Sequence, residues 1–408
     1  MKLTVRYLGD SDAPVVGELF ESPDLKIYFQ FDPQWRNRGL ELSPLYLPSS
    51  TEGSLRSPTP QFSELFGLFD DSLPDWWGQQ LLKRFFEDKG IRWNRVGLLQ
   101  KLAAQGSYGI GAIGYEPDEA PLDFRSQLSI EIADLVEAAR GIIDGQPADT
   151  LSLLVRSGLT AGGAQPKALI HLSDDFKTVW PGGGEPPQDS NPWLIKFQLD
   201  REVHTTREEH AYRLMAEAAG IDIPETRLIE DRDGRVHFLI RRFDRYKDRK
   251  IHFHSFSGLT HTRPGDGLDY GDLMNLARSL CQNESAVEEF FRRAVFNVAA
   301  GNEDDHGRNH GFLMTNDGQW QPSPAYDVTY ATHPLATNLR SASVLGKFSN
   351  LSRTDLVELG KDQGIRRVKD IIDRVVTAMG RWREYAEDAG LPEHHAALLH
   401  DEMPASRW

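Results

Sequence analysis

The strongest constraint on the fold is a change of pattern close to residue 244. Before it, from about residue 152, short segments rich in strand-forming side chains alternate with turns, and one helical stretch (207–220) interrupts them. Beyond it, apolar residues recur at helical spacing in the segments 270–280, 284–301, 354–364 and 368–390. A β-rich part followed by an α-rich part predicts an α+β fold of two lobes with a cleft between them.

The region before these two parts is predicted to be an accessory unit. It combines strand-like pieces and Pro/Ser-rich loops with one helical stretch (75–88), and a segment rich in Pro and acidic residues (115–123) follows it. We therefore expect three parts, which are an accessory unit (1–118), a β-rich lobe (119–244) and a helical lobe (245–408).

Charge and cysteine content restrict the possible partners. The formal net charge is -15 at pH 7, and phosphate recognition draws on clustered Lys and Arg, so we expect no unaided binding to nucleic acid. Cys281 is the only cysteine, which excludes an internal disulfide and suits a reducing compartment. No apolar run approaches the ~18 residues of a membrane span, and the start, MKLTVRYLGD, loses its apolar character too early for a signal peptide. We expect a cytoplasmic protein without a membrane partner.

A polar loop (302–310) follows the second of the helical segments and carries the residues on which the functional prediction depends. Phosphoryl transfer needs a carboxylate that accepts or orients the proton of the nucleophile, and oxygen ligands for Mg²⁺. Protein kinases place an Asp and, five residues later, an Asn on one loop, and a second Asp after a hairpin. Asp304 and Asn309 have this spacing, and Asp327 follows a strand, a turn and a second strand. The order predicts Asp304 as catalytic base and Asn309 and Asp327 as metal ligands.

These residues also allow a purely structural interpretation. Asp304 and Asp305 could belong to an acidic surface loop, Asn309 could cap a turn, and Asp327 could be a helix N-cap or part of an Asx turn. Their joint placement around a hairpin after a buried helix favours the kinase interpretation.

A metal-dependent phosphohydrolase is a further alternative, with Asp304, Asp305, His306 and His310 as ligands. A zinc pair with this histidine spacing needs a continuous helix, and Gly307 in the loop argues against one. We expect His306 to brace the loop by hydrogen bonding instead.

A lysine in an apolar strand supplies the cation that a nucleotide needs. Lys196 lies in the middle of WLIKFQ (193–198), where a charged ammonium is costly unless it is paired. We expect Glu208 or Glu209 on the next helix to be its partner, as in the strand-lysine to helix-glutamate pair of kinases. The alternative is an edge strand whose lysine reaches water.

Two glycine-containing loops are candidates for phosphate contact. Gly109, Gly111 and Gly114 form a GxGxxG pattern, but they lack the strand–turn–helix context of a dinucleotide fold, so we expect a tight turn. The loop 160–167, TAGGAQPK, lies between two strand-like segments ahead of Lys196, where a kinase phosphate loop belongs. Its adjacent glycines let the backbone approach a phosphate closely.

The chain resembles the HipA family of bacterial serine/threonine kinases, which are the toxins of type II toxin–antitoxin modules. Five motifs carry the resemblance in this order: GGAQPK, WLIKF, RRFDR, NEDDHGRN and AYDV. DDSLPDWWG and GSYGIGAIGYEP in the accessory unit also resemble that family, so the resemblance spans nearly the whole chain. It implies a two-lobed, protein-kinase-like fold, with ATP and Mg²⁺ as cofactors.

The resemblance also implies roles for individual residues. Asp304 would be the catalytic base, Lys196 the phosphate-binding lysine, and 241–243 the hinge beside the adenine. In family members a serine of the phosphate loop is autophosphorylated; its position is Thr160 here, and Ser157 is a nearby alternative acceptor. The residues implied to contact the nucleotide or its metal are Ala161, Gly162, Gly163, Ala164, Gln165, Lys167, Lys196, Arg241, Arg242, Phe243, His306, Asn309 and Asp327.

Partners follow from the same resemblance. It implies a protein substrate such as an aminoacyl-tRNA synthetase, whose phosphorylation halts translation and leads to persistence, and a small helix-turn-helix antitoxin. Contact with DNA would be indirect, because the antitoxin would supply the positive charge that this acidic chain lacks. The alternative within the same fold is a catalytically silent, kinase-like corepressor.

Overall fold

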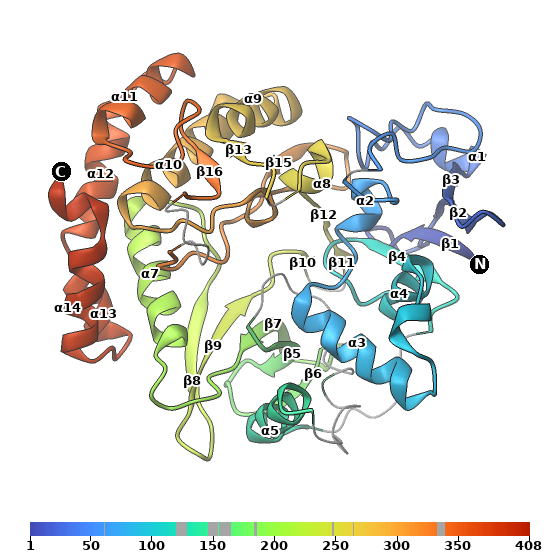
Figure 1. The fold of residues 1–408 in the computed structure, drawn as a ribbon, viewed down its shortest axis with the longest axis horizontal. Coiled ribbons are helices and arrows are strands. Elements are labelled where there is room, and N and C mark those ends of the chain that lie inside the picture. The colour runs from blue at the N-terminus through green and yellow to red at the C-terminus, as the bar shows by residue number, and fades with distance from the viewer. Residues whose placement is uncertain are drawn as a thin grey trace.

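The computed structural model describes residues 1–60, 62–119, 129–145, 154, 165–182, 186–246, 249–263, 265–332 and 339–408. Within them the chain forms an accessory unit, a β-rich lobe and a helical lobe (Figure 1). The accessory unit contacts both lobes. Its helix α2 (Gly67–Asp70) lies against α8 (Phe256–Thr260) of the helical lobe, and its helix α3 (Trp76–Asp88) lies against α5 (Ile132–Ile143) of the β-rich lobe.

An antiparallel sheet of four strands, in the order β3-β2-β1-β4, is the centre of the accessory unit. Leu3, Val5 and Tyr7 are fully buried and alternate with more exposed residues along β1, so one face of this sheet is apolar. The strands are β1 (Lys2–Tyr7), β2 (Val15–Glu21), β3 (Ile27–Phe31) and β4 (Ile113–Glu116), and the further helices are α1 (Pro33–Arg36), η1 (Trp93–Arg95) and α4 (Leu98–Gln105).

The described residues of the β-rich lobe form an antiparallel sheet of five strands in the order β6-β5-β7-β9-β8. Its strands are β5 (Lys167–Ser173), β6 (Val179–Pro181), β7 (Ser190–Lys196), β8 (Thr226–Glu230) and β9 (Val236–Arg241). Strand β7 lies at the centre of the sheet, so the edge-strand interpretation of Lys196 is wrong. Strands β8 and β9 pair as an antiparallel hairpin, and helix α7 (Thr205–Ala219) packs between this sheet and the helical lobe.

Helix α10 (Glu284–Ala299) is the buried centre of the helical lobe. Its helical spacing brings Phe291, Ala294, Val295 and Val298 into the core. The other elements are β10 (Arg245–Tyr246), β11 (Arg249–Lys250), β12 (His252–Ser255), β13 (Leu268–Asp269), α9 (Tyr270–Cys281), η2 (Gly307–Asn309), β14 (Gly311–Met314), β15 (Trp320–Pro322), β16 (Ala342–Ser343), α11 (Arg353–Asp362), α12 (Val368–Met379), α13 (Trp382–Asp388), α14 (Glu393–Glu402) and η3 (Pro404–Arg407). Within the described ranges, none of the helices combines the length and the apolar character needed to cross a membrane.

The segment 368–390, predicted as one helical stretch, forms two helices instead. Helix α12 ends at Met379, and Arg381 has a non-helical backbone (φ -99°, ψ 14°) ahead of α13. The break turns Trp382 into the core, where its ring centroid lies 5.2 Å from that of Tyr212. Tertiary packing of this indole therefore overrides the helical periodicity, and Gly380 beside the break lowers the helix propensity there.

Two apolar clusters make up the core. The larger one runs from the accessory sheet into the helices of the helical lobe, and includes Val5, Phe29, Phe290 and Val295. The smaller one joins α3 and α5 to strands β5 and β7. The accessory unit thus buries one apolar surface against each lobe, and this places it beside the cleft between them.

Candidate active site

Both lobes and the accessory unit line one cleft of about 220 Å³. Aliphatic side chains of β5, β7 and β9 and aromatic side chains of the helical lobe form its apolar part, and a lysine with several carboxylates forms its polar part. The described lining residues are Asp71, Leu73, Asp75, Ile110, Leu169, Leu194, Lys196, Glu209, Ile240, Arg241, Arg242, Phe243, Asp244, Phe253, Ser255, His306, Arg308, Asn309, Tyr326 and Asp327.

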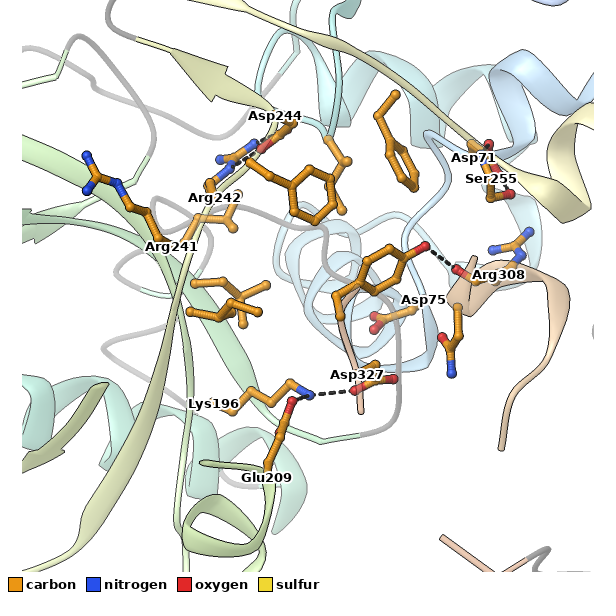
Figure 2. A pocket seen from close by; sticks show the side chains of 18 of the residues that line it. Asp71, Asp75, Lys196, Glu209, Arg241, Arg242, Asp244, Ser255, Arg308 and Asp327 are labelled. Atoms are coloured by element: carbon orange, nitrogen blue, oxygen red, sulfur yellow. Dashed lines mark hydrogen bonds and ion pairs between the residues drawn. The ribbon is translucent and has the colours of Figure 1, made fainter. Parts of the chain in front are cut away.

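Lys196 lies in the polar part and bridges two carboxylates (Figure 2). Its Nζ is 2.6 Å from Oε1 of Glu209 and 2.5 Å from Oδ1 of Asp327. The prediction of a glutamate partner on the next helix is therefore confirmed for Glu209. The other candidate, Glu208, pairs with His395 at 2.8 Å.

The two carboxylates keep Lys196 protonated. Burial lowers the pKa of Lys196, but Asp327 and Glu209 more than offset this and raise it above its ordinary value. Burial raises the pKa of Asp327, but Lys196 holds it below its ordinary value. Asp327 also has a left-handed backbone (φ 56°), a conformation that Asp tolerates better than most residues and that occurs frequently at functional sites.

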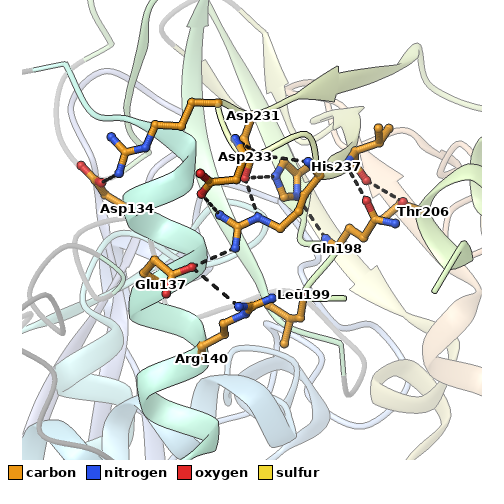
Figure 3. A network of polar contacts seen from close by, with 12 residues as sticks. Asp134, Glu137, Arg140, Gln198, Leu199, Thr206, Asp231, Asp233 and His237 are labelled. Atoms are coloured by element: carbon orange, nitrogen blue, oxygen red, sulfur yellow. Dashed lines mark hydrogen bonds and ion pairs between the residues drawn. The ribbon is translucent and has the colours of Figure 1, made fainter. Parts of the chain in front are cut away.

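A polar network beside α5 fixes the start of α7 and thereby its glutamate (Figure 3). Nη1 of Arg235 donates to Oε1 of Glu137 on α5 at 2.8 Å. At the next residue, the N–H of Val236 donates to the side chain of Gln198, which follows β7, at 2.5 Å. The carbonyl of Val236 accepts from the hydroxyl of Thr206 in the first turn of α7 at 2.7 Å. Strand β9, the end of β7 and the helix are thus held in one arrangement.

Asp304 lies beside the cleft and half exposed. Its side chain is 50% exposed, and it is not among the described residues that line the cleft. Nδ2 of Asn309 donates to the backbone carbonyl of Asp304 at 2.7 Å, which closes the loop between them. A carboxylate in this position is accessible to a hydroxyl group of another macromolecule, as a general base needs to be.

The side chain of Asp305 braces this loop, whereas the side chain of His306 does not. The buried carboxylate of Asp305 accepts from the hydroxyl of Tyr270 at 2.6 Å and pairs with Arg340. Nε2 of His306 lies 3.8 Å from Oδ1 of Asp304, beyond hydrogen-bond distance, and its Nδ1 has no hydrogen-bond partner among the described residues. The prediction that His306 braces the loop is wrong for its side chain, which lines the cleft, although its backbone carbonyl accepts from the N–H of Asn309 at 2.8 Å.

The side chains of the metal-hydrolase alternative do not converge. Asp305 is occupied by Arg340, and the ring of His310 is buried beside those of Tyr270 and Phe290, at centroid distances of 5.7 and 6.2 Å. Burial lowers the pKa of His310 to about 3. Across the part of the chain that the structure describes, no group of three or more His, Cys, Asp or Glu side chains could hold a metal ion. The structure does not support this alternative.

All three residues of the predicted hinge, Arg241, Arg242 and Phe243, line the cleft. The guanidinium of Arg242 pairs with Asp244 at 2.8 Å, and the ring of Phe243 packs against that of Tyr326 at 5.6 Å. The hinge therefore offers an apolar ring to the cleft, while the charge of Arg242 is balanced by the residue that follows the hinge.

The GxGxxG turn of the accessory unit contacts this hinge. The carbonyl of Gly109 accepts from Nη2 of Arg242 in the hinge at 3.3 Å, and the N–H of Gly111 donates to Oδ2 of Asp244, directly after the hinge, at 2.8 Å. Ile110, between the two glycines, lines the cleft. The sequence predicted a tight turn here. The contact of this turn beside the hinge joins residues 133 positions apart, so no local sequence pattern could predict it.

Asp71 of the accessory unit is another residue that sequence reasoning missed. Its carboxylate lies 2.6 Å from Nδ1 of His254 and accepts from the N–H and the hydroxyl of Ser255 at 2.7 and 2.6 Å. The adjacent Asp70 pairs with Arg308 of the loop that follows Asp305, at 2.5 Å. Both acids belong to the DDSLPDWWG motif, which was the only available signal.

Lys167 lies directly opposite Lys196 in the register of β5 and β7. It is buried, and its Nζ is 3.0 Å from Oδ2 of Asp75. The side chain of Gln165 donates to the carbonyl of Phe197 at 3.4 Å. The other residues predicted for the phosphate loop and for autophosphorylation lie outside the described residues; they are Ser157, Thr160, Ala161, Gly162, Gly163 and Ala164.

Comparison with protein families decides the classification. Residues 159–383 match the profile of the HipA-like C-terminal domain, and residues 11–116 match that of the HipA N-terminal domain. The chain belongs to the HipA family. The two matches cover the accessory unit and most of both lobes, in agreement with the resemblance seen in the sequence motifs.

Similar proteins of known sequence carry kinase names. The candidate kinase Y4mE of Sinorhizobium fredii is 25% identical over 295 residues, which is 67% of this chain and 66% of that protein. The candidate kinase Y4dM of the same organism is 28% identical over 240 residues, which is 53% of this chain and 58% of that protein. The chain thus matches less than two thirds of the length of either relative.

A solved HipA structure has the same fold. It is the HipA of the complex of HipA, HipB and operator DNA from Shewanella oneidensis MR-1, and it matches with a TM-score of 0.71 over 100% of this chain and 97% of that chain, at 18% identity. The match establishes the fold, and confirms the predicted two-lobed, protein-kinase-like α+β architecture.

The donor set of the cleft fits Mg²⁺. Asn309 and Asp327 line the same cleft, and amide and carboxylate oxygens are hard ligands of the kind that Mg²⁺ prefers. Mg²⁺ is commonly held by one or two protein side chains together with substrate phosphates and water, so a complete protein cage is not required.

Proposed function

We propose that this protein is an ATP-dependent serine/threonine-protein kinase of the HipA type. The observation that carries the proposal is the cluster of Lys196, Glu209 and Asp327 in the cleft, with Asn309 in the same cleft and Asp304 half exposed beside it. A lysine that carboxylates keep protonated is the cation that the phosphates of ATP need. The kinase names of the relatives support the same activity.

Each residue has a separate role in the proposed reaction. Lys196 binds the phosphates, and Asn309 and Asp327 would hold Mg²⁺, which neutralises phosphate charge when bound. Asp304 accepts the proton of a serine or threonine hydroxyl as its oxygen attacks the γ-phosphorus. The bond from the γ-phosphorus to the β–γ bridging oxygen breaks, and ADP leaves. The adenine would lie in the apolar part of the cleft, beside Phe243.

The proposed partners follow from family membership and charge. We propose a HipB-like, helix-turn-helix antitoxin as partner, a translation component such as an aminoacyl-tRNA synthetase as substrate, and a cytoplasmic location. With a net charge of -15, the chain would reach operator DNA only through the antitoxin. Autophosphorylation at Thr160 or Ser157 is part of the proposal, because a phosphate would add about two negative charges to a loop that binds phosphates.

Transfer of labelled γ-phosphate from Mg·ATP to protein tests this proposal. We expect Asp304→Ala and Asp327→Ala to lower the rate by about 10²- to 10⁴-fold, because one removes the base and the other a metal ligand and the partner of Lys196. Glu358→Ala, which removes an exposed acid on α11, is the matched control and should keep the wild-type rate. Mass spectrometry of the wild-type product locates the phosphate on Thr160 or Ser157.

Full activity in both aspartate variants would overturn the assigned roles. A wild-type protein that binds ATP without any turnover would favour the silent corepressor instead.

A further inference from the structure

The positive charges of two lysines in the cleft region are balanced by carboxylates from different parts of the molecule. Lys167 and Lys196 are directly opposite each other on β5 and β7, so their side chains share one face of the sheet. The carboxylates that meet Lys196 come from the two lobes. The carboxylate that meets Lys167 is that of Asp75, from the accessory unit, at 3.0 Å.

Helix α3 holds Lys167 through both its side chain and its backbone. Asp75 is the N-cap of α3, where its Oδ1 accepts from the N–H of Gly78 at 2.7 Å while its Oδ2 pairs with Lys167. The indole N–H of the buried Trp77 donates to the backbone carbonyl of Lys167 at 2.9 Å. Lys167, the last residue of the predicted phosphate loop, is therefore held by the accessory unit.

The acid, rather than the lysine, faces the cleft. Asp75 is among the described residues that line it (Figure 2), and Lys167, whose side chain is 2% exposed, is not. A triphosphate that enters the polar part would meet the Asp75 carboxylate in front of the Lys167 ammonium.

Burial disfavours the charged forms of both Asp75 and Lys167. Burial raises the pKa of Asp75, and Asp327 adds to this; burial lowers the pKa of Lys167, and Lys196 adds to that. Breaking a buried pair is costly when nothing replaces the lost partner. A phosphate would provide Lys167 with a replacement, while Asp75 would keep its bond at the start of α3.

We propose that Asp75 is a positioning residue that holds Lys167 until the triphosphate of ATP replaces it as the acceptor. This inference rests on the proposed function, because it requires ATP in this cleft. The bond of Trp77 to the backbone of Lys167 is independent of the exchange, so α3 stays docked and only side chains move. The accessory unit thereby lowers the affinity for the phosphates of ATP but not for its nucleoside part.

Calorimetric titration of the full-length protein with Mg·ATP and, separately, with adenosine tests the inference. We expect Asp75→Asn to bind ATP about tenfold more tightly than the wild type, because the competing carboxylate is gone and more of the protein is competent to bind phosphate. Adenosine affinity should not change. Asparagine is itself a good N-cap, so the variant keeps the start of α3 and should fold. Glu87→Gln, which removes an exposed charge on the same helix, is the matched control and should not change either affinity.

A double-mutant cycle tests whether Asp75 acts through Lys167. Lys167→Met should weaken ATP binding, and Asp75→Asn should raise ATP affinity less in that background than in the wild type. An unchanged or weaker ATP affinity in Asp75→Asn, or an equal change for adenosine, would overturn the inference while leaving the kinase proposal intact. A wild-type protein that binds neither ligand would overturn both.

Discussion

Two regions of the cleft hold a buried lysine by different balances of charge. Where the lobes meet, two carboxylates outweigh the effect of burial and raise the pKa of Lys196. Where the accessory unit docks, burial and the nearby Lys196 outweigh the carboxylates of Asp75 and Asp327 and lower the pKa of Lys167. The comparison teaches that two carboxylates favour a permanent cation at the first lysine, whereas the weaker balance at the second suits the exchange of partner that we propose for it.

Removal of the permanent cation should have the largest effect. We expect Lys196→Met to reduce phosphoryl transfer by about 10³-fold, because it removes a charge that is pre-oriented toward the phosphates. It should also destabilise the protein by about 3 kcal/mol, since the buried carboxylate of Glu209 and the partly buried carboxylate of Asp327 lose their partner. Initial rates and urea unfolding measure the two effects.

Two further variants show whether the stability loss comes from uncompensated charge. Adding Glu209→Gln to Lys196→Met should restore part of the stability and none of the activity. Lys83→Met, at an exposed position of α3, should match the wild type in both measurements. If Lys196→Met were as stable as Lys83→Met, the charge of Lys196 would not stabilise the two carboxylates that it contacts.

An effect of intermediate size is expected where the accessory unit meets the helical lobe. In Asp71→Asn the new amide group presents hydrogens to donors that the carboxylate accepted from, so at least one buried donor loses its acceptor. We expect a stability loss of about 2 to 3 kcal/mol, measured by urea unfolding at neutral pH. Phosphoryl transfer by the remaining folded protein should change far less than in Lys196→Met.

The pH dependence of the same variant gives a second test. Burial raises the pKa of Asp71, but His254 and Ser255, with Arg308, hold it below the ordinary value of 3.8. The stabilisation is therefore fully present above the unfolded-state pKa and is lost as pH falls below 3.8 through the folded-state pKa. Wild-type stability should fall more steeply with acid than that of Asp71→Asn; parallel curves would contradict this origin.

The region built by the lobes was largely predictable from the sequence. A lysine within an apolar strand needs a counter-charge, and the following helix offered only Glu208 and Glu209 close to its start. The order of Asp304, Asn309 and Asp327 around a predicted hairpin then indicated one cleft, which Asn309 and Asp327 line while Asp304 lies beside it. These relations depend on short sequence separations, where the periodicities of strands and helices determine which side chains meet.

The accessory contacts were not predictable, because their partners are far apart in the sequence. Asp75 and Lys167 are separated by 92 positions, and Asp71 and Ser255 by 184. Even neighbours can differ in a way that no local pattern reveals: Asp305 is buried because Arg340 reaches it from 35 positions away, whereas Asp304 beside it is half exposed. The sequence alone therefore allowed two interpretations of these acids, as parts of one surface loop or as ligands of one metal site.

The smallest expected effect concerns the turn that docks on the hinge. Gly111 has a left-handed backbone (φ 77°), and a Cβ there would lie 3.1 Å from the backbone nitrogen of Phe253. Gly145 has a similar backbone (φ 68°) but open space around it, so Gly145→Ala measures the backbone strain alone, about 1 kcal/mol. Gly111→Ala should lose more stability than this in urea unfolding, and adenosine affinity should fall slightly because Ile110 moves with the turn. Equal losses in the two variants would show that the turn does not pack closely against the backbone of β12 beside the cleft.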